Sequence, residues 1–545
     1  MSRSPSHLLL LALTSVLLLA CNPEPKTNAP AADTEVPANK IQTTSTPIVQ
    51  TLNGDIQGLA VDGINNFRGI PYAQPPVGTL RWRPPQAPSS WEGLFSADTF
   101  SLSCSQPTFT SEYVWRRNDF QTSEDCLYLN VWAQAGAQDL PVMVWFHGGA
   151  HTSGQGHSKI FDGTTLAEHG VVLVSINYRL GALGFLAHPW LSEESDHESS
   201  GNYGLLDKIA ALNWVRDNIA QFGGNPDNVT IFGQSAGSQS VCSLMTSPLA
   251  QGLFHKAIGQ SAACVGPAPR RDPAGLERGE RLVAELGAES LDALRAKSPS
   301  DILSATDVTG WANQSRIVID GWVLPEAQIE TFKAGRQAAV PLMVGNLADE
   351  GENLIPINSA LTTEAYDAYV DATFGSEASR IKQAYVAELE QSPGIAQHAI
   401  ATDQFMAFAM RRWAEYQTAR HPSTYLYFMD HVPPAFHLYM PDEPDLAHPR
   451  GPRHAAYHSG DLAFVFGTVD KVGLDWNEED RALSALMVKY WTNFARTGNP
   501  NSDDTPEWPA FMRDSLSTQV LNAQPHTVSG IRRDRIDPMA AALPL

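Results

Sequence analysis

Basic side chains are scarce in this chain of 545 residues. Its 37 Lys and Arg stand against 59 Asp and Glu, which gives a formal net charge of −22 at pH 7. A surface of that sign repels phosphate backbones and anionic lipid head groups. The composition therefore argues against nucleic-acid binding, and contact with a membrane is expected only through an attached lipid.

A long apolar run is also missing, because Leu8–Ala20 spans only 13 residues and about 20 are needed to cross a bilayer. This run follows a short segment with Arg3, as in a secretory signal. It ends in Leu-Leu-Ala-Cys at Cys21, which resembles a bacterial lipobox, whose cysteine is diacylated and becomes the first residue. We predict a signal peptide over residues 1–20 and lipidation of Cys21. The alternative is a plain signal peptide with a chance cysteine.

The residues after Cys21 bear on where the protein goes. Asn22 stands where a lipobox protein retained at the inner membrane has Asp, so the resemblance favours outer-membrane sorting. Two acyl chains anchor a protein stably where one would not. Residues 22–45 are rich in Pro, Ala and Thr without apolar periodicity, so we predict a flexible, lipid-anchored linker over residues 21–45. The expected location is an exported lipoprotein, facing the periplasm or the cell surface.

Cysteine is rare, with five in the chain. No CxxC pair or Cys/His cluster points to zinc, so no metal is expected. With Cys21 assigned to lipid, four cysteines remain in an oxidising compartment and allow three pairings. We favour Cys104–Cys126, whose loop would contribute roughly 3 kcal/mol in the chain-entropy model, with Cys242–Cys264 as the second pair.

What the chain does have is an ordinary globular balance, 43% hydrophobic and 18% charged, which excludes disordered, collagen-like and coiled-coil proteins. β-rich apolar runs alternate with helical stretches such as Gly204–Gln221, and the runs are Leu140–Gly149, Gly170–Arg179 and Asn228–Gly237. This alternation predicts an α/β fold with a mainly parallel sheet flanked by helices. Residues 46–545 are expected to form one domain, with helical excursions over 273–330 and 361–425 that cover the sheet.

A candidate nucleophile lies in Gly233–Gly237, which reads Gly-Gln-Ser-Ala-Gly after the strand-like VTIF. A nucleophile on a sharp strand-to-helix turn needs small residues two positions away on each side, because the backbones crowd there. The helix that follows points its N-terminal amides at the site and favours developing negative charge. The pattern predicts Ser235 as a nucleophile, and the alternative is an ordinary glycine-rich turn.

A second glycine turn, His147–Ala150, ends the earlier strand. Such a turn can offer successive backbone N–H groups to an oxyanion, and the N–H of Ala236 at the helix start adds another. The alternative is a tight turn that only needs glycine flexibility. His147 itself is interpreted as structural.

Four longer segments carry further information, namely SEDCLYLNVW (Ser123–Trp132), NYRLGALGFL (Asn177–Leu186), GGNPDNVTIFGQSAG (Gly223–Gly237) and YWTNFARTGNPN (Tyr490–Asn501). They resemble the type-B carboxylesterases, a family that includes cholinesterases, bile-salt lipases and bacterial para-nitrobenzyl esterases. The resemblance extends from about Thr46 to Ile536. It implies the α/β-hydrolase fold, with helical excursions over an active-site gorge, and a Ser–Glu–His triad in that chain order.

The resemblance also implies the other triad members. In VGNLADEGENL the family's acid is the residue before glycine, Glu350, with Asp349 and Glu352 as competitors. In HSGDLAFVFG the family's base is His458, with His454 as its rival. Because a serine hydroxyl is a weak nucleophile at neutral pH, a positioned imidazole must take its proton.

By the same resemblance, the oxyanion amides belong to Gly149, Ala150 and Ala236. The family often has a third glycine where Ala150 stands, but alanine keeps the N–H. Cys104–Cys126 matches the family's disulfide-closed loop at the gorge mouth. Two structural ion pairs are expected, namely Arg81 or Arg83 with Glu124, and Arg179 with Asp207.

Substrate choice depends on two positions. Cholinesterases hold a quaternary ammonium on a Trp of the disulfide loop, and Trp115 stands there as a possible substrate-pocket residue. Cholinesterases also carry an acid before the nucleophile, where this chain has neutral Gln234, which weakens the case for a cation site. Trp115 is therefore interpreted as a loop anchor or aromatic wall.

The sequence thus predicts a serine carboxylesterase that hydrolyses small to medium alkyl or aryl esters through an acyl-enzyme intermediate, without a cofactor. One alternative is an adhesion or binding protein on the same scaffold, in which catalysis is dispensable. Another is a dedicated lipase, polyester esterase or natural-product esterase, which would share the chemistry and differ only in the pocket.

Overall fold

The computed structural model describes residues 43–108, 114–115, 121–265, 275–311, 317–440, 453–473 and 475–543. The chain from Gln42 to Leu545 is one compact unit. The predicted signal peptide, Cys21 and nearly all of the predicted linker lie outside the described residues. None of the described helices is both long and apolar enough to cross a bilayer.

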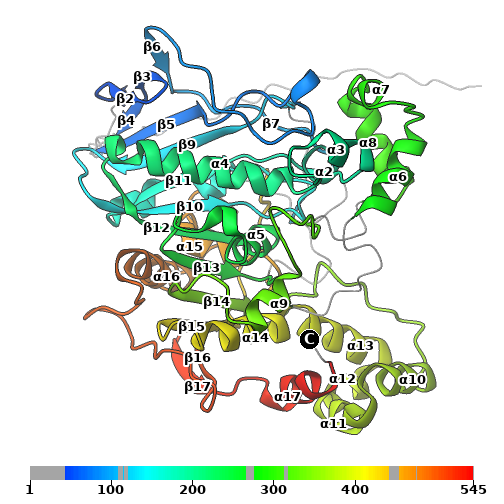
Figure 1. Ribbon diagram of the computed structural model, residues 1–545. Coiled ribbons are helices and arrows are strands. Elements are labelled where there is room, and N and C mark those ends of the chain that lie inside the picture. The colour runs from blue at the N-terminus through cyan, green and yellow to red at the C-terminus, as the bar shows by residue number, and fades with distance from the viewer. Residues whose placement is uncertain are drawn as a thin grey trace, which may run out of the picture. The chain divides into compact units, whose positions relative to one another are not determined.

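A large mixed sheet, twelve-stranded within the described residues, runs through this unit (Figure 1). Its strands, in spatial order, are β1 (Thr43–Ser45), β4 (Leu59–Val61), β5 (Ile64–Pro71), β9 (Tyr128–Gln134), β11 (Val172–Ile176), β10 (Leu140–Phe146), β12 (Gly224–Gln234), β13 (Lys256–Gln260), β14 (Leu342–Leu347), β15 (Thr424–Met429), β16 (Ser517–Leu521) and β17 (His526–Ser529). In this spatial order, neighbouring strands from β11 through β16 are parallel, whereas neighbouring strands on either side of that block are antiparallel. The prediction of a mainly parallel α/β sheet is confirmed.

Alternate side chains of the central strands enter two different cores, because successive strand residues point to opposite faces. In β10, Val142 and Val144 join one core, whereas Met143 and Trp145 join the other. The first core includes residues of α4 (Tyr203–Asn218), α5 (Ala236–Leu244) and α14 (Phe408–Thr418). The second includes residues of α1 (Thr164–Glu168), α15 (Leu462–Phe466) and α16 (Glu478–Thr497). Both faces of the sheet are therefore covered by helices.

The two predicted helical excursions are present. The first contains α6 (Leu276–Glu285), α7 (Leu291–Arg295), α8 (Pro299–Val308) and α9 (Gln328–Lys333), and the second contains α10 (Thr363–Phe374), α11 (Ala378–Ala384), α12 (Val386–Gln391), α13 (Pro393–Thr402) and α14. Helices α10, α11 and α13 share a third apolar cluster with α17 (Arg533–Ala542). Figure 1 shows this group gathered beside the β15–β17 end of the sheet.

The remaining described elements are short. Helices α2 (Gly181–Phe185) and α3 (Pro189–Glu194) precede α4. Two small sheets are formed by β2 (Val49–Thr51), β3 (Gly54–Gln57) and β6 (Leu94–Ser96), and by β7 (Ser103–Cys104) and β8 (Thr122–Ser123).

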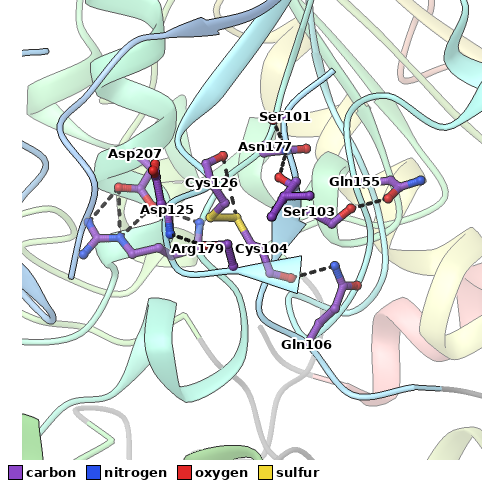
Figure 2. Close-up of a disulfide and its surroundings, with 12 residues drawn as sticks. Ser101, Ser103, Cys104, Gln106, Asp125, Cys126, Gln155, Asn177, Arg179 and Asp207 are labelled. Atoms are coloured by element: carbon purple, nitrogen blue, oxygen red, sulfur yellow. Dashed lines mark hydrogen bonds and ion pairs between the residues drawn. A yellow bond between two sulfur atoms is a disulfide. The ribbon is translucent and has the colours of Figure 1, made fainter. Parts of the chain in front are cut away.

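Both favoured disulfides are present, Cys104–Cys126 and Cys242–Cys264. Figure 2 shows the first of them beside the buried ion pair of Arg179 and Asp207, whose Nη2 and Oδ1 atoms are 2.7 Å apart. The other expected pair is formed by Arg81 with Glu124, through Nε and Oε1 at 2.6 Å. Arg83 pairs instead with Glu194 at 2.7 Å, which decides between the two arginines that the sequence left open.

Candidate active site

Ser235 occupies the turn between β12 and α5, with φ 56° and ψ −126°. Residues other than glycine seldom adopt such a backbone, and its strain is typical of functional turns. A Cβ on Gly237 would lie 1.9 Å from the carbonyl oxygen of Phe146, and one on Gly233 would lie 2.5 Å from the carbonyl carbon of Gly237. The crowding expected from the sequence therefore explains both glycines, and it leaves Ser235 at the tip of the turn.

The second glycine turn faces this serine. Gly149 has φ 101°, and a Cβ there would lie 2.1 Å from the carbonyl oxygen of Ser153, so only glycine fits. Ala150 follows with φ 54°, a conformation that favours glycine but admits alanine at some cost. Ala236 is the first residue of α5, whose N-terminal amides have no acceptor within the helix. Gly149, Ala150 and Ser235 line one cavity.

The His147 side chain is hydrogen-bonded to the backbone of the glycine turn. Its Nδ1 donates to the carbonyl oxygen of Gly148 at 2.8 Å, and its ring stacks on Tyr178 with centroids 4.3 Å apart. The Tyr178 hydroxyl donates to the carbonyl oxygen of His147 at 2.7 Å. Burial lowers the pKa of His147 to about 3, so this imidazole is neutral. These contacts agree with a structural role.

Glu350 and His458 meet because the segments that carry them pair. Asp349 and Tyr457 form a parallel β-bridge, in which the Asp349 N–H donates to the carbonyl oxygen of Ala456 at 3.0 Å. The next residues along both segments then lie side by side, with His458 Nδ1 2.5 Å from Glu350 Oε2. The other carboxylate oxygen of Glu350 accepts from the Leu347 N–H at 2.8 Å. Both side chains are buried.

The alternative acids, Asp349 and Glu352, and the alternative histidine, His454, make other contacts. The Asp349 carboxylate accepts from the Ala456 N–H at 2.9 Å and thereby holds the β-bridge together. Glu352 lies 3.5 Å from His454, so the rival acid and the rival histidine pair with each other. The structure thus brings Glu350 and His458 together, and places Asp349, Glu352 and His454 outside that contact.

The second ring nitrogen of His458 contacts Gln234, a residue that was not expected to touch the imidazole. His458 Nε2 lies 3.2 Å from the side-chain amide nitrogen of Gln234. Because Nδ1 faces a carboxylate, it carries the proton, and Nε2 is the acceptor of the ring. The amide of Gln234 therefore donates to His458.

A buried carboxyl group, Asp461, lies close to the pair and was not expected from the sequence. Its Oδ2 accepts from Gln260 Nε2 at 2.7 Å and from the Tyr427 hydroxyl at 3.3 Å. Burial raises the pKa of Asp461 to about 6, and the charge of Glu350 acts in the same direction. This carboxyl group is thus easier to protonate than an exposed one.

The cavity in front of Ser235 has a volume of about 150 Å³. The ring of Trp115 forms part of its wall and lies 6.0 Å from the His458 ring, centroid to centroid. Within the described ranges, no group of three or more His, Cys, Asp or Glu is placed to hold a metal ion. The described residues that line the cavity are Trp115, Gly148, Gly149, Ala150, Thr152, Ser153, Phe161, Gln234, Ser235, Leu354, Leu438, Tyr439, His458, Ser459 and Leu462.

A mainly parallel sheet with a serine at the strand–helix turn after a central strand defines the α/β-hydrolase class. The model of the carboxylesterase family matches residues 45–537, and the chain belongs to this family. The protein is a carboxylic ester hydrolase.

Several relatives are about one third identical over most of their length. The para-nitrobenzyl esterase of Bacillus subtilis is 34% identical over 492 residues, covering 88% of this chain and 95% of that protein. The fumonisin B1 esterase of Sphingopyxis macrogoltabida is 34% identical, covering 85% and 84%. The human cocaine esterase is 34% identical, covering 92% of both.

Solved structures agree with this assignment. A PNB esterase structure has a TM-score of 0.75 and 33% identity, covering 90% of this chain and 99% of that chain. The carboxylesterase of Geobacillus stearothermophilus has a TM-score of 0.77 and 32% identity, with the same coverage of 90% and 99%. The α/β-hydrolase fold expected from the resemblance is confirmed.

Proposed function

We propose that Ser235 is the nucleophile of this ester hydrolase, with His458 as general base and Glu350 as the carboxylate that orients the imidazole. The observation that carries this proposal is the 2.5 Å contact between His458 Nδ1 and Glu350 Oε2, both buried, beside a cavity that Ser235 and His458 line together. A carboxylate on Nδ1 leaves Nε2 free of a proton and able to accept one.

In the first half of the reaction, the Ser235 oxygen attacks the ester carbon while His458 Nε2 takes the serine proton. The carbonyl oxygen becomes an oxyanion that accepts hydrogen bonds from the N–H groups of Gly149, Ala150 and Ala236. The bond to the alcohol oxygen then breaks, and His458 returns the proton to the leaving alkoxide. An acyl-enzyme and a free alcohol remain.

In the second half, water takes the place of the alcohol. His458 accepts a proton from the water as its oxygen attacks the acyl carbon, and the same amides hold the new oxyanion. The bond to Ser235 breaks and the proton passes to the serine oxygen, which releases the acid and regenerates the enzyme. Glu350 stabilises the imidazolium in both halves.

We further propose small to medium uncharged esters as substrates. The described lining of the cavity includes no Asp, Glu, Lys or Arg, and aromatic and aliphatic side chains such as Trp115, Phe161 and Leu438 form much of it. Such a wall favours apolar acyl or alcohol groups. Neutral Gln234 supplies no carboxylate to attract a cationic ester.

The test is hydrolysis of p-nitrophenyl esters of increasing acyl length by the wild-type protein, Ser235→Ala and His458→Ala. We expect serine-dependent turnover with an optimum at short acyl groups, and a loss of several orders of magnitude in both variants. An optimum at long acyl groups would favour a lipase. Activity retained by Ser235→Ala would contradict the assignment of the nucleophile.

We also propose that the protein is exported as a lipoprotein, with residues 1–20 as signal peptide, acylation at Cys21, a linker over 21–45 and the hydrolase domain from residue 46. The support is the Leu-Leu-Ala-Cys sequence at the end of the apolar run, together with two disulfides, which persist in oxidising compartments. Cys21→Ser should move the protein from the membrane to the soluble fraction. Unchanged membrane partition would contradict acylation.

A further inference from the structure

The Gln234 side chain contacts both His458 and the glycine turn His147–Ala150. Gln234 is the last residue of β12, only 2% exposed, and it pairs in register with Gln260 at the end of β13. Its Nε2 lies 3.2 Å from His458 Nε2. Its Oε1 lies 3.0 Å from the place where a Cβ of Gly148 would stand, so the amide is in contact with the glycine turn. One side chain thus lies between the imidazole and the glycine turn.

A primary amide suits both protonation states of that imidazole. A neutral ring presents a lone pair at Nε2, to which the amide NH₂ donates, whereas an imidazolium presents an N–H, which the amide oxygen can accept. The torsion that exchanges the two ends of the amide is broad and roughly two-fold, so it imposes little intrinsic cost. A carboxylate at this position would suit only the imidazolium, and a thioether would suit neither state.

We propose that Gln234 is a positioning residue for His458, whose amide donates to Nε2 in the free enzyme, yields that nitrogen to the Ser235 hydroxyl, and turns its oxygen to the imidazolium after proton transfer. The ring is then held from both edges, by Glu350 at Nδ1 and by Gln234 at Nε2. This inference rests on the proposed role of His458 as the general base.

Two carboxyl groups bear on the protonation of the imidazole, and one further titratable group lines the cavity. Glu350 contacts Nδ1 directly. Asp461, on the segment that follows His458, interacts with His458 through its charge. Tyr439 lines the same cavity. Because two carboxyl groups already lie close to His458, a neutral amide at residue 234 avoids a third negative charge. A third carboxylate would stabilise the imidazolium, so the imidazolium would be a weaker acid and the neutral base would be less available.

The experiment compares Gln234→Glu and Gln234→Met, which keep the length of the side chain, with the wild-type protein. The readouts are kcat and KM for p-nitrophenyl butyrate, and the acid limb of the pH profile of kcat/KM, which reports the base of the free enzyme. The matched controls are Gln519→Glu and Gln519→Met, since Gln519 is also buried in a strand, β16, and accepts from Thr527 at 2.9 Å. Thermal unfolding follows the folded state of each variant.

For Gln234→Glu we expect the acid limb to move to higher pH by about one unit, because a carboxylate at hydrogen-bond distance favours the imidazolium. For Gln234→Met we expect kcat to fall roughly tenfold with KM within twofold, because the ring loses one of its two supports. The Gln519 variants should leave the acid limb in place. A purely structural role for Gln234 would change the unfolding temperature without moving the acid limb.

The proposal is overturned if the acid limb of Gln234→Glu stays within about 0.2 pH units of wild type, or if Gln234→Met keeps kcat within twofold. If one variant does not fold, the other decides through its own readout. A failure of the proposed function is seen separately, as activity retained in Ser235→Ala or His458→Ala, and it does not depend on any Gln234 variant.

Discussion

Glu350 and His458 are 108 residues apart in the chain, and their side chains are 2.5 Å apart in the structure. The contact depends on the backbone of their neighbours, because the bridge between Asp349 and Tyr457 aligns the two segments one residue earlier. A single carboxylate oxygen, Glu350 Oε2, then determines which ring nitrogen of His458 carries the proton.

Replacing the Glu350 carboxylate should lower kcat without lowering the stability of the fold. In Glu350→Gln the amide can no longer stabilise the imidazolium, so kcat should fall by roughly 10³–10⁴-fold. The unfolding temperature should change little, because the side chain keeps its size. The matched control is Glu352→Gln, which alters the acid that lies near His454. Steady-state kinetics with p-nitrophenyl butyrate checks both, and equal losses in the two variants would contradict the assignment of Glu350.

A methyl group on the glycine turn should also lower kcat, by a smaller factor. In Gly149→Ala the new Cβ would meet the Ser153 carbonyl oxygen at 2.1 Å, so the turn must shift and its amides leave their positions. We expect kcat to fall by about 10²–10³-fold, the loss typical of one oxyanion donor. Gly136→Ala is the control, because Gly136 also has a positive φ, 76°, but open space around its Cβ. Wild-type kcat in Gly149→Ala would show that this turn does not serve the oxyanion.

Asp461 should make stability depend on pH. Its pKa in the fold is about 6, above the ordinary 3.8, so the fold favours the protonated acid. The stability that this provides is complete below about pH 4 and is lost as the pH rises through 6. Because asparagine cannot ionise, the free energy of unfolding of Asp461→Asn should exceed that of wild type. This difference should grow from pH 4.5 to pH 7.5, to on the order of 2 kcal/mol. Urea unfolding across that range, with exposed Asp503→Asn as control, tests this. A difference independent of pH would contradict it.

Lys208 carries a buried amine that contacts the Tyr178 ring. Lys208 Nζ is 3.0 Å from the centre of the Tyr178 ring and donates to the carbonyl oxygen of Gly204 at 3.1 Å. Burial lowers the pKa of Lys208 well below its usual range, so the fold favours the neutral amine. The unfolded chain prefers the ammonium until the pH passes its ordinary value of 10.5. Stability therefore rises with pH in the wild-type protein.

Lys208→Met should remove the free-energy cost of burying the Lys208 amine. We expect the variant to be more stable than wild type at pH 7 by roughly 1–3 kcal/mol, with a smaller gain at pH 9.5. Urea unfolding at both values measures the difference. A less stable variant at pH 7 would mean that the contacts of the amine with Tyr178 and Gly204 outweigh its burial.

The features that could be predicted from the sequence are those with a local steric cause. Gly233 and Gly237 flank Ser235 because the strand and helix backbones touch there, and Gly149 is required by the nearby carbonyl of Ser153. The parallel strands β10 and β11 are almost entirely apolar because both faces of the sheet are covered, which makes them easy to recognise. Both disulfides match the favoured pairing, in which Cys104–Cys126 is also implied by the family resemblance and Cys242–Cys264 is the second pair.

What could not be predicted depends on side chains from distant segments. Gln234 and His458 are 224 residues apart, and Gln260 and Asp461 are 201 apart, so no local pattern indicates either contact. The choice of Arg81 over Arg83 as the partner of Glu124 is of the same kind, because neighbouring arginines look alike until their backbones are placed. Strands β1 to β4 have only three or four residues each, which is too few to show a period.

The uncharged lining of the cavity also affects how the reaction ends. Hydrolysis of a neutral ester, the proposed substrate, releases a carboxylic acid that ionises at neutral pH, and no described Lys or Arg of the lining would hold the resulting anion. The net charge of −22 adds a repulsive field outside the cavity. An anionic product that has left the cavity is therefore disfavoured from returning, and we expect weak inhibition of the enzyme by the carboxylic acid that it releases.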